Sequence, residues 1–169
     1  MSRLTVATET VFTNTFQAMQ QEPGVVLFTV LQWIPQRSGL RRLYTSHPEA
    51  YPVGAEKTVE ISPGWLGTVI EDKKPFLAPD LDSLREVFTD SALIQQLGCG
   101  AVINIPVLDD HGNVAGVLAL LDAEGHYTQQ SVDTAVGVVE ASRPQLLEAF
   151  AAYPTDLPAR TEVPVKDTF

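Results

Sequence analysis

The sequence predicts an α+β fold in which helices pack on an antiparallel β-sheet, and two features of its patterning lead to this prediction. Apolar strand-like runs occur as two pairs, each joined by a short turn, which is typical of β-hairpins. Helix-like periodicity marks both ends of the chain and the segment between the two pairs. Helices set apart from hairpins in this way are expected to lie against the faces of one sheet.

An amphipathic helix is predicted at the start of the chain, over residues 5–21. Phe12, Phe16 and Met19 recur at the spacing that places side chains on one face of a helix. Glu22-Pro23-Gly24 then supplies a stop, because proline and glycine both disfavour continuation of a helix.

The first hairpin is predicted from residues 25–34 and 41–46. The first run is rich in β-branched and aromatic residues and ends at Pro35, and turn-forming residues precede the second run. Residues 47–54 contain two prolines and a glycine, so a loop is expected there.

Short, irregular elements are predicted between the two hairpins. Pro63 stands in the first turn of a predicted helix whose apolar face carries Trp65 and Val69. A brief extended piece at 76–78 and two short helices within 81–97 complete this part of the chain.

The second hairpin has the clearest pattern. The apolar runs 101–108 and 114–121 are joined by Asp109-Asp110-His111-Gly112-Asn113, a strongly turn-forming loop. A helix is predicted from residue 128, and it is expected to kink or restart at Pro144 because proline cannot donate a backbone hydrogen bond.

These elements are expected to form one domain over residues 1–153, followed by a flexible, proline-containing tail over 154–169. A chain of 169 residues is long enough for one sizeable core. No apolar run is long enough to cross a membrane, and the N-terminus lacks the pattern of a secretory signal, so a cytoplasmic location is expected.

Composition limits the possible partners. Acidic residues number 21 and basic residues 11, and the resulting formal charge of −10 repels phosphate backbones, so direct nucleic-acid binding is not expected. The single cysteine, Cys99, allows neither an internal disulfide nor a zinc site built from cysteines.

The order and spacing of these motifs resemble the GAF domain family. The likeness covers about residues 5–150. It is carried by the hairpin 101–122, with Pro106, Gly112 and Gly116, and by three upstream segments, Leu43-Tyr44-Thr45-Ser46, Pro63-Gly64-Trp65-Leu66 and Pro75-Phe76-Leu77. The resemblance implies a central antiparallel sheet with the N- and C-terminal helices on one face and short helices and loops over the other. It also implies a small ligand, of unknown identity, between the sheet and residues 47–100, and a homodimer through the terminal helices.

Candidate ligand-binding residues lie in this covering segment, residues 47–100, and at the adjacent strand positions. They are Tyr44, Ser46, Trp65, Phe76, Phe88, Leu97, Cys99 and Asn104. Ordinary packing explains Tyr44 and Trp65 as well as ligand contact does. Asn104 interrupts an apolar strand, and its amide either binds the ligand or satisfies backbone groups on the other sheet face. Cys99 is either a redox sensor or a small buried residue.

A metal site is the less favoured interpretation of Asp122, Glu124 and His126. Their alternation would place all three on one side of an extended backbone. A solvated, charged loop containing Gly125 explains the same pattern more simply, so no metal is predicted.

The leading functional hypothesis is a small-molecule-binding sensory domain, without an output domain of its own, that informs a separate signalling partner. One alternative is a structural dimerisation or docking module with no ligand. Another is an enzyme similar to the GAF-type reductases of free methionine sulfoxide, which is disfavoured because Cys99 has no resolving cysteine. A hydrolase is weaker still, because the sequence lacks a Gly-x-Ser-x-Gly motif.

Overall fold

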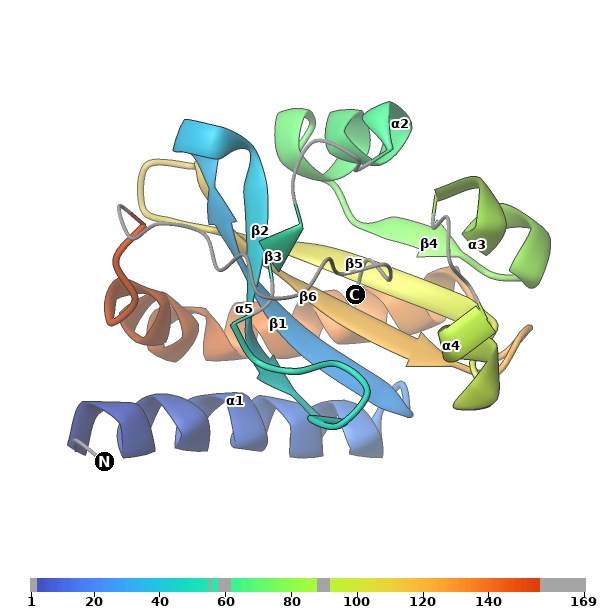
Figure 1. Cartoon of the computed structure of the whole chain (residues 1–169), viewed down its shortest axis with the longest axis horizontal. Coiled ribbons are helices and arrows are strands. Elements are labelled where there is room, and N and C mark those ends of the chain that lie inside the picture. Colours follow the sequence, from blue (N-terminus) through green and yellow to red (C-terminus); the bar gives the residue numbers. More distant parts are fainter. Residues whose placement is uncertain (1–2, 55, 58–61, 88–91, 156–169) are drawn as a thin grey trace.

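The computed structural model describes residues 3–54, 56–57, 62–87 and 92–155 (Figure 1). Within these residues the chain forms a six-stranded antiparallel sheet with the strand order β3-β2-β1-β6-β5-β4. The strands are β1 (Leu27–Ile34), β2 (Gly39–Thr45), β3 (Glu56–Lys57), β4 (Phe76–Ala78), β5 (Ala101–Leu108) and β6 (Val114–Asp122). The helices are α1 (Arg3–Gln21), α2 (Pro63–Leu66), α3 (Leu81–Val87), α4 (Ala92–Gln96) and α5 (Gln129–Ala151), with a 3-10 turn η1 (Pro35–Arg37) and a π-helical turn η2 (Gly67–Glu71).

The sheet separates two apolar clusters, and α1 and α5 lie together against one of its faces (Figure 1). On this helix face, Phe12 of α1 and Val139 of α5 are buried with the strand residues Phe28 and Ile103. The predicted placement of the terminal helices on one face is confirmed.

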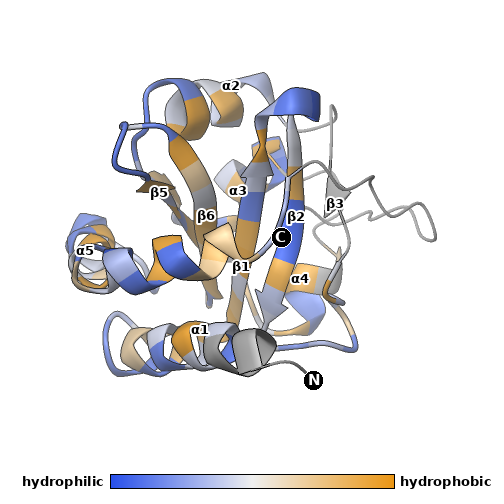
Figure 2. Cartoon of the chain, turned by 90° about the vertical axis from the view of Figure 1, so that its left-hand side faces the viewer, coloured by the Kyte–Doolittle hydropathy of each residue, from blue (hydrophilic) through white to orange (hydrophobic). Residues whose placement is uncertain are grey.

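The covering segment packs on the other face, which we call the cover face. Trp65, Val69, Leu84 and Ile94 are fully buried there. Figure 2 shows that apolar residues concentrate on the central strands, whereas the β1–β2 and β5–β6 turns are hydrophilic. Because successive side chains of a strand point to opposite faces, each central strand contributes apolar residues to the clusters on both faces of the sheet.

Both predicted hairpins are present, as β1–β2 and β5–β6, and the short helices α2, α3 and α4 lie between them. Of the two outcomes expected at Pro144, a kink or a restart, the restart does not occur, because α5 runs through this residue from Gln129 to Ala151. Thr128 caps this helix by accepting a hydrogen bond from the Ser131 backbone N–H. Strand β3 was not predicted, because two residues are too short for a periodic pattern.

A β-bulge changes the alternation within β2. Val30 of β1 is opposite Tyr44, but Leu31 is opposite Arg42, so Leu43 is an extra residue in the second strand. Arg42 and Tyr44 therefore lie on opposite faces of the sheet, although they are two residues apart.

The end of the described chain is attached to the first hairpin. Gln32 Nε2 donates to Tyr153 O (2.7 Å), Arg41 Nη1 donates to Pro154 O (3.1 Å), and Gln36 Nε2 donates to Thr155 Oγ1 (3.1 Å). The first two residues of the predicted flexible tail are thus held by side chains of β2 and its turn. Residues 156–169 lie outside the described part of the chain.

Among the described helices, none combines the length and apolar character that a membrane span requires.

Candidate functional site

The cover face contains a buried contact between the two strongest candidates from the sequence. Trp65 extends from the first turn of α2, and its Nε1 donates to Oδ1 of Asn104 in the middle of β5, at 2.9 Å. Both residues are fully buried. The structure thus places Asn104 on the side of the covering segment, which resolves the two orientations that the sequence allowed.

Half of the Asn104 amide has no partner. With Oδ1 taken by Trp65, Nδ2 is a buried donor that makes no hydrogen bond within the described residues. A buried polar atom left in this state costs about 1–3 kcal/mol relative to a paired one.

A second unpartnered polar atom lies on the same cross-strand row. Asn104 is opposite Ala119 of β6, Ala119 is opposite Thr29 of β1, and Thr29 is opposite Thr45 of β2. The hydroxyl of Thr29 is buried without a hydrogen-bond partner, whereas Thr45 Oγ1 accepts from the His47 backbone N–H at 3.0 Å. Ala119 is the residue between them on this row, and we call the two unpartnered groups the Asn104–Thr29 pair.

A buried guanidinium adds positive charge to the same face. Arg42 is opposite Leu31 and is almost fully buried, with its guanidinium carbon 5.0 Å from the centroid of the Tyr51 ring. Its Nη1 donates to Pro52 O at 3.2 Å. Arginine stays protonated in proteins, so this part of the core carries a permanent positive charge.

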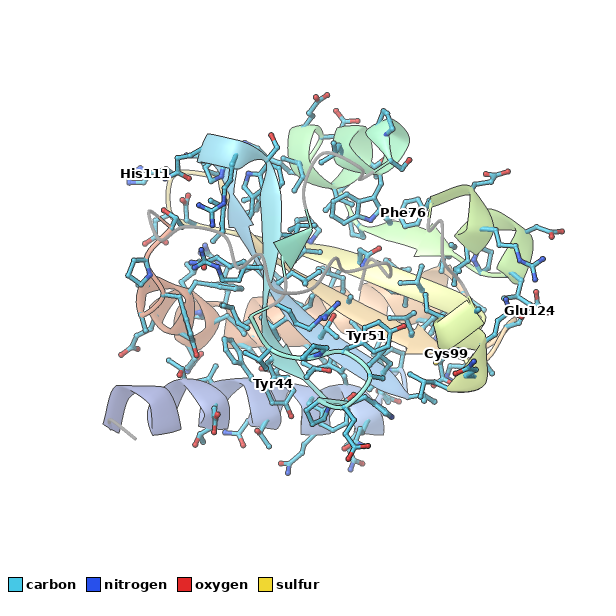
Figure 3. All side chains as sticks on the ribbon, viewed as in Figure 1. Tyr44, Tyr51, Phe76, Cys99, His111 and Glu124 are labelled. Atoms are coloured by element: carbon cyan, nitrogen blue, oxygen red, sulfur yellow. The ribbon has the colours of Figure 1, made fainter. Side chains whose placement is uncertain are left out.

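Tyr44, a candidate ligand-binding residue for which ordinary packing was the alternative, lies on the other face of the sheet. Its ring packs against Phe12, Phe16 and Phe28, with centroid distances of 6.0, 6.4 and 6.0 Å. Figure 3 shows Tyr44 toward α1 and Phe76 on the side of α2 and α3. The bulge at Leu43 is the physical reason, since one extra residue reverses the face of every side chain that follows it.

Ser46 closes the end of the first hairpin instead of approaching Trp65. Its Oγ accepts a hydrogen bond from the Phe28 backbone N–H at 2.9 Å and lies 2.9 Å from Nδ1 of His47. The hydroxyl is therefore already used within the protein.

Phe76, Leu97 and Cys99 do join the cover-face cluster. Phe76 is opposite Asn104 in the sheet, and Phe76 and Leu97 are half-buried. Cys99 is only 3% exposed, and burial, with a smaller contribution from the charge of Asp122, raises the pKa of its thiol to about 11. A thiol in this state is a poor nucleophile at neutral pH. Phe88 lies outside the described residues.

Space around the Asn104–Thr29 pair is closed in this structure. Asn104, Thr29 and the intervening Ala119 have no exposed surface, and Trp65 above them has none either. The open void expected between the sheet and the covering segment is therefore not seen at these residues. Ligand entry here requires the covering segment to move.

The residues considered for a metal do not converge. His126 Nε2 lies 3.6 Å from Asp122 Oδ2 and 2.9 Å from Pro23 O, whereas Glu124 Oε2 accepts a hydrogen bond from the Leu81 backbone N–H. In the described part of the chain, no three His, Cys, Asp or Glu residues gather in a group that could hold a metal ion.

Comparison with known proteins places this arrangement in a family. The sequence profile of the GAF domain matches residues 4–151. No curated protein sequence matches the chain significantly.

Solved structures of low sequence identity share the fold. A type II free methionine-R-sulfoxide reductase from Thermoplasma acidophilum has a TM-score of 0.66 at 11% identity, and the alignment covers 87% of this chain and 97% of that one. A GAF domain/HD domain protein from Geobacter sulfurreducens has a TM-score of 0.65 at 7% identity, with coverages of 83% and 92%. The GAF domain of a two-component sensor histidine kinase from Bacillus halodurans has a TM-score of 0.61 at 13% identity, with coverages of 85% and 94%.

Proposed function

The chain belongs to the GAF domain family, and on this basis we propose that it is a sensory module that binds a small molecule on the cover face, at the Asn104–Thr29 pair. The observation that carries the proposal is the presence of two buried polar atoms, Asn104 Nδ2 and Thr29 Oγ1, that have no hydrogen-bond partner on one row of the sheet. A ligand that forms hydrogen bonds with these two atoms removes the free-energy cost of burying them unpaired, and this gain favours binding.

The hydrogen-bonding roles limit the chemistry of the ligand. Because Oδ1 of Asn104 accepts from Trp65, the free Nδ2 requires an acceptor on the ligand. The hydroxyl of Thr29 can donate or accept. Successive cross-strand Cα distances place Asn104 and Thr29 about 10 Å apart. The ligand is therefore a small, flat molecule with polar groups at both ends, lying across Ala119.

The acceptor that Asn104 Nδ2 requires limits the ligand to molecules with an accessible oxygen or nitrogen lone pair. Carboxylates and nucleobase carbonyls both meet the requirement for an acceptor.

Entry of the ligand shifts the covering segment around Trp65, and this shift supplies the signal. Trp65 lies over Asn104, and α2 continues directly into the π-helical turn η2. π-Helical turns are rare and occur frequently at functional sites. Movement of α2 and η2 changes the surface of the covering segment, which a separate signalling partner then recognises.

A thermal-shift screen against amino acids, short dicarboxylates and nucleobases tests this proposal. A ligand that binds only the folded state raises the melting temperature by mass action. One compound class should stabilise the wild-type protein and fail to stabilise Thr29→Val. Thr45→Val is the matched control, because it removes a hydroxyl from the same row that is already bonded to His47. Equal stabilisation of all three proteins would show that the ligand binds elsewhere.

A structural docking module without a ligand is the second candidate, and the closed packing around Asn104 favours it. Native mass spectrometry of protein purified under gentle conditions separates the two. The sensor proposal expects an additional small mass, or a compound from the screen that produces one. A mass equal to that of the polypeptide under every condition supports the docking module.

We do not propose a reductase, although the structural relatives include reductases of free methionine sulfoxide. The buried thiol of Cys99, with its raised pKa, is unsuited to attack on a sulfoxide. Thiol-dependent reduction of free methionine sulfoxide by the wild type, lost in Cys99→Ser, would overturn this conclusion.

We further propose a cytoplasmic homodimer formed through the outer surfaces of α1 and α5. Asn14 of α1 and Ala141 of α5 are exposed and line a shallow depression of about 210 Å³ between the two helices. Light scattering should give twice the chain mass for the wild type and a lower mass for Ala141→Arg. A monomeric wild type would exclude the dimer.

A further inference from the structure

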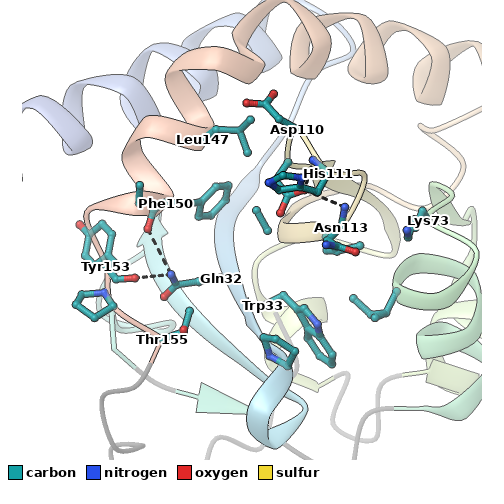
Figure 4. A pocket seen from close by; sticks show the side chains of 17 residues that line it. Gln32, Trp33, Lys73, Asp110, His111, Asn113, Leu147, Phe150, Tyr153 and Thr155 are labelled. Atoms are coloured by element: carbon teal, nitrogen blue, oxygen red, sulfur yellow. Dashed lines mark hydrogen bonds between the residues drawn. The ribbon is translucent and has the colours of Figure 1, made fainter.

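The two hairpins diverge at one end of the sheet. Pairing between β1 and β6 ends at Gln32 and Gly116, yet β1 continues to Ile34 beside β2, and β6 already begins at Val114 beside β5. A groove of about 900 Å³ occupies this fork, between the β1–β2 turn, the β5–β6 turn and the end of α5 (Figure 4). We call it the fork groove.

Residues 153–155, which we call the strap, form one wall of the fork groove. Helix α5 ends at Ala151, and the strap does not extend it, because Pro154 lacks a backbone N–H and disfavours a helical conformation at the residue before it. The strap instead lies beside the end of the first hairpin, to which it is hydrogen-bonded.

Gln32 holds the first residue of the strap, but only half of its amide is satisfied. Nε2 donates to Tyr153 O at 2.7 Å and to Phe150 O at 3.4 Å (Figure 4). Both partners are acceptors, so the orientation of the amide is fixed and the other atom is Oε1. This oxygen is buried and accepts no hydrogen bond from the described residues. The closed strap therefore carries the cost of an unpaired buried carbonyl.

The other two strap residues are held by side chains at the surface. Arg41 Nη1 donates to Pro154 O, and Gln36 Nε2 donates to Thr155 Oγ1, both at 3.1 Å and both exposed. Within the part of the chain that the structure describes, no main-chain hydrogen bond joins the strap to the hairpin. Water competes for exposed side-chain bonds, so the strap can separate from the hairpin without any loss of strand pairing.

The end of α5 is anchored more firmly than the strap. Phe150 is buried in the helix-face cluster, and its ring lies so close to β6 that no space remains for a Cβ at Gly116. Beyond this anchor, the Tyr153 hydroxyl adds one long contact to α1, at 3.4 Å from Thr8 Oγ1. Motion of the strap therefore begins after Phe150 and leaves the helix in place.

We propose that the strap is a releasable gate on the fork groove, closed while Gln32 holds Tyr153 and open when this bond breaks. When the strap lifts, the groove extends over Gln32 and Phe150. The unpaired Oε1 lowers the free energy that opening requires, because this oxygen gains hydrogen bonds to water only in the open state. No residue that holds the strap lies on the row of the Asn104–Thr29 pair, so the gate stands or falls independently of the cover-face site.

Hydrogen exchange of the Gln32 side-chain amide, followed by NMR on ¹⁵N-labelled full-length protein, measures the opening directly. Because this group exchanges only after it leaves Tyr153 O, its protection factor gives the ratio of closed to open strap. We expect this factor to be at least about 100-fold smaller than those of backbone amides in the centres of β5 and β6, whose exchange requires unfolding of the sheet. Equal protection would overturn the proposal, because the strap would then open only with the whole domain.

Thr155→Val tests whether the strap moves as one unit. The change removes the acceptor of Gln36 at nearly unchanged shape and at an exposed bond, so the fold is retained. It should lower the protection factor of the Gln32 side chain about threefold and leave β5 and β6 unaffected. Thr134→Val makes the same change near the start of α5 and is the matched control. Unaltered protection of Gln32 in Thr155→Val would contradict the gate.

Gln32→Glu should hold the gate open. The variant loses the donor and places a carboxylate against two carbonyl oxygens, so the NMR signals of residues 153–155 should move away from their wild-type positions. Gln36→Glu is the control on the same hairpin, and it should move only the signal of Thr155. Wild-type signals for residues 153–155 in Gln32→Glu would reject the proposal. Where this variant does not fold, the exchange measurements on the wild type and Thr155→Val decide.

Discussion

Replacing Thr29 with valine should stabilise the ligand-free protein. The two side chains have nearly the same shape, and both suit a β-strand, so the main change is the loss of a hydroxyl group. In the native state this hydroxyl is fully buried and makes no hydrogen bond. In the unfolded state water satisfies it, so folding the wild-type protein carries a desolvation cost that the valine variant avoids.

The magnitude follows from the cost of an unsatisfied buried polar group, which is about 1–3 kcal/mol. We take the lower end and expect the free energy of unfolding to rise by about 1 kcal/mol. For a chain of this size, that corresponds to a rise in melting temperature of about 2–4 °C. The expected sign is unusual, because most substitutions in a core destabilise a protein.

Thr45 offers a control directly opposite Thr29 in the sheet. Its Oγ1 accepts from the His47 backbone N–H at 3.0 Å, so Thr45→Val loses a hydrogen bond and should destabilise the protein by about 1 kcal/mol. Urea denaturation of the two variants and the wild type, with equal m-values, measures both effects. Destabilisation by Thr29→Val equal to that by Thr45→Val would refute the reasoning, because it would show that the Thr29 hydroxyl already has a partner.

Three further predictions concern the core around the site. The pKa of Cys99 is raised to about 11 in the folded state, so its contribution to stability, on the order of 2 kcal/mol, is complete below the unfolded pKa near 9.0 and should be lost as pH rises through about 11. In urea melts over that pH range, Cys99→Ala should lose less stability than the wild type, and parallel pH profiles would contradict the assignment. Gly116→Ala should destabilise the protein by about 1–3 kcal/mol, because an added Cβ would lie 2.3 Å from Cζ of Phe150; a neutral effect in thermal unfolding would mean that α5 yields freely. Trp65→Phe should lower the free energy of unfolding by about 1–2 kcal/mol, because Asn104 Oδ1 loses its hydrogen bond to Trp65. Calorimetry should also show an altered affinity for the stabilising compound, and unchanged stability and affinity together would mean that Trp65 only fills space.

Local patterns predicted the fold well where neighbouring residues determine it. The β5–β6 hairpin follows from alternating apolar residues around a turn whose Asp109 side chain accepts from two backbone N–H groups, all within one short stretch. The end of the first helix likewise follows from proline and glycine. The sequence allowed either a kink or a restart of the last helix at Pro144, and no restart occurs, because packing of residues on both sides of the proline outweighs one lost backbone hydrogen bond.

The candidate site was predictable only in part, since its key features depend on pairing between distant strands. Trp65 and Asn104 stood out as a large aromatic residue and a polar residue in apolar surroundings, and they are in contact. Thr29 gave no such signal, because threonine is common in strands and its missing partner appears only once β1, β6 and β2 are in register. The choice between packing and ligand contact for Tyr44 could not be made from the sequence, because the bulge that sets its face leaves no mark there.

The most direct test of the cover-face site is the side-chain ¹H–¹⁵N signal of Asn104, recorded while the stabilising compound from the thermal screen is added. An acceptor that reaches Nδ2 should shift this signal strongly and slow exchange of its hydrogens with water. A signal that stays unchanged at saturating compound, while the melting temperature still rises, would contradict binding at the Asn104–Thr29 pair.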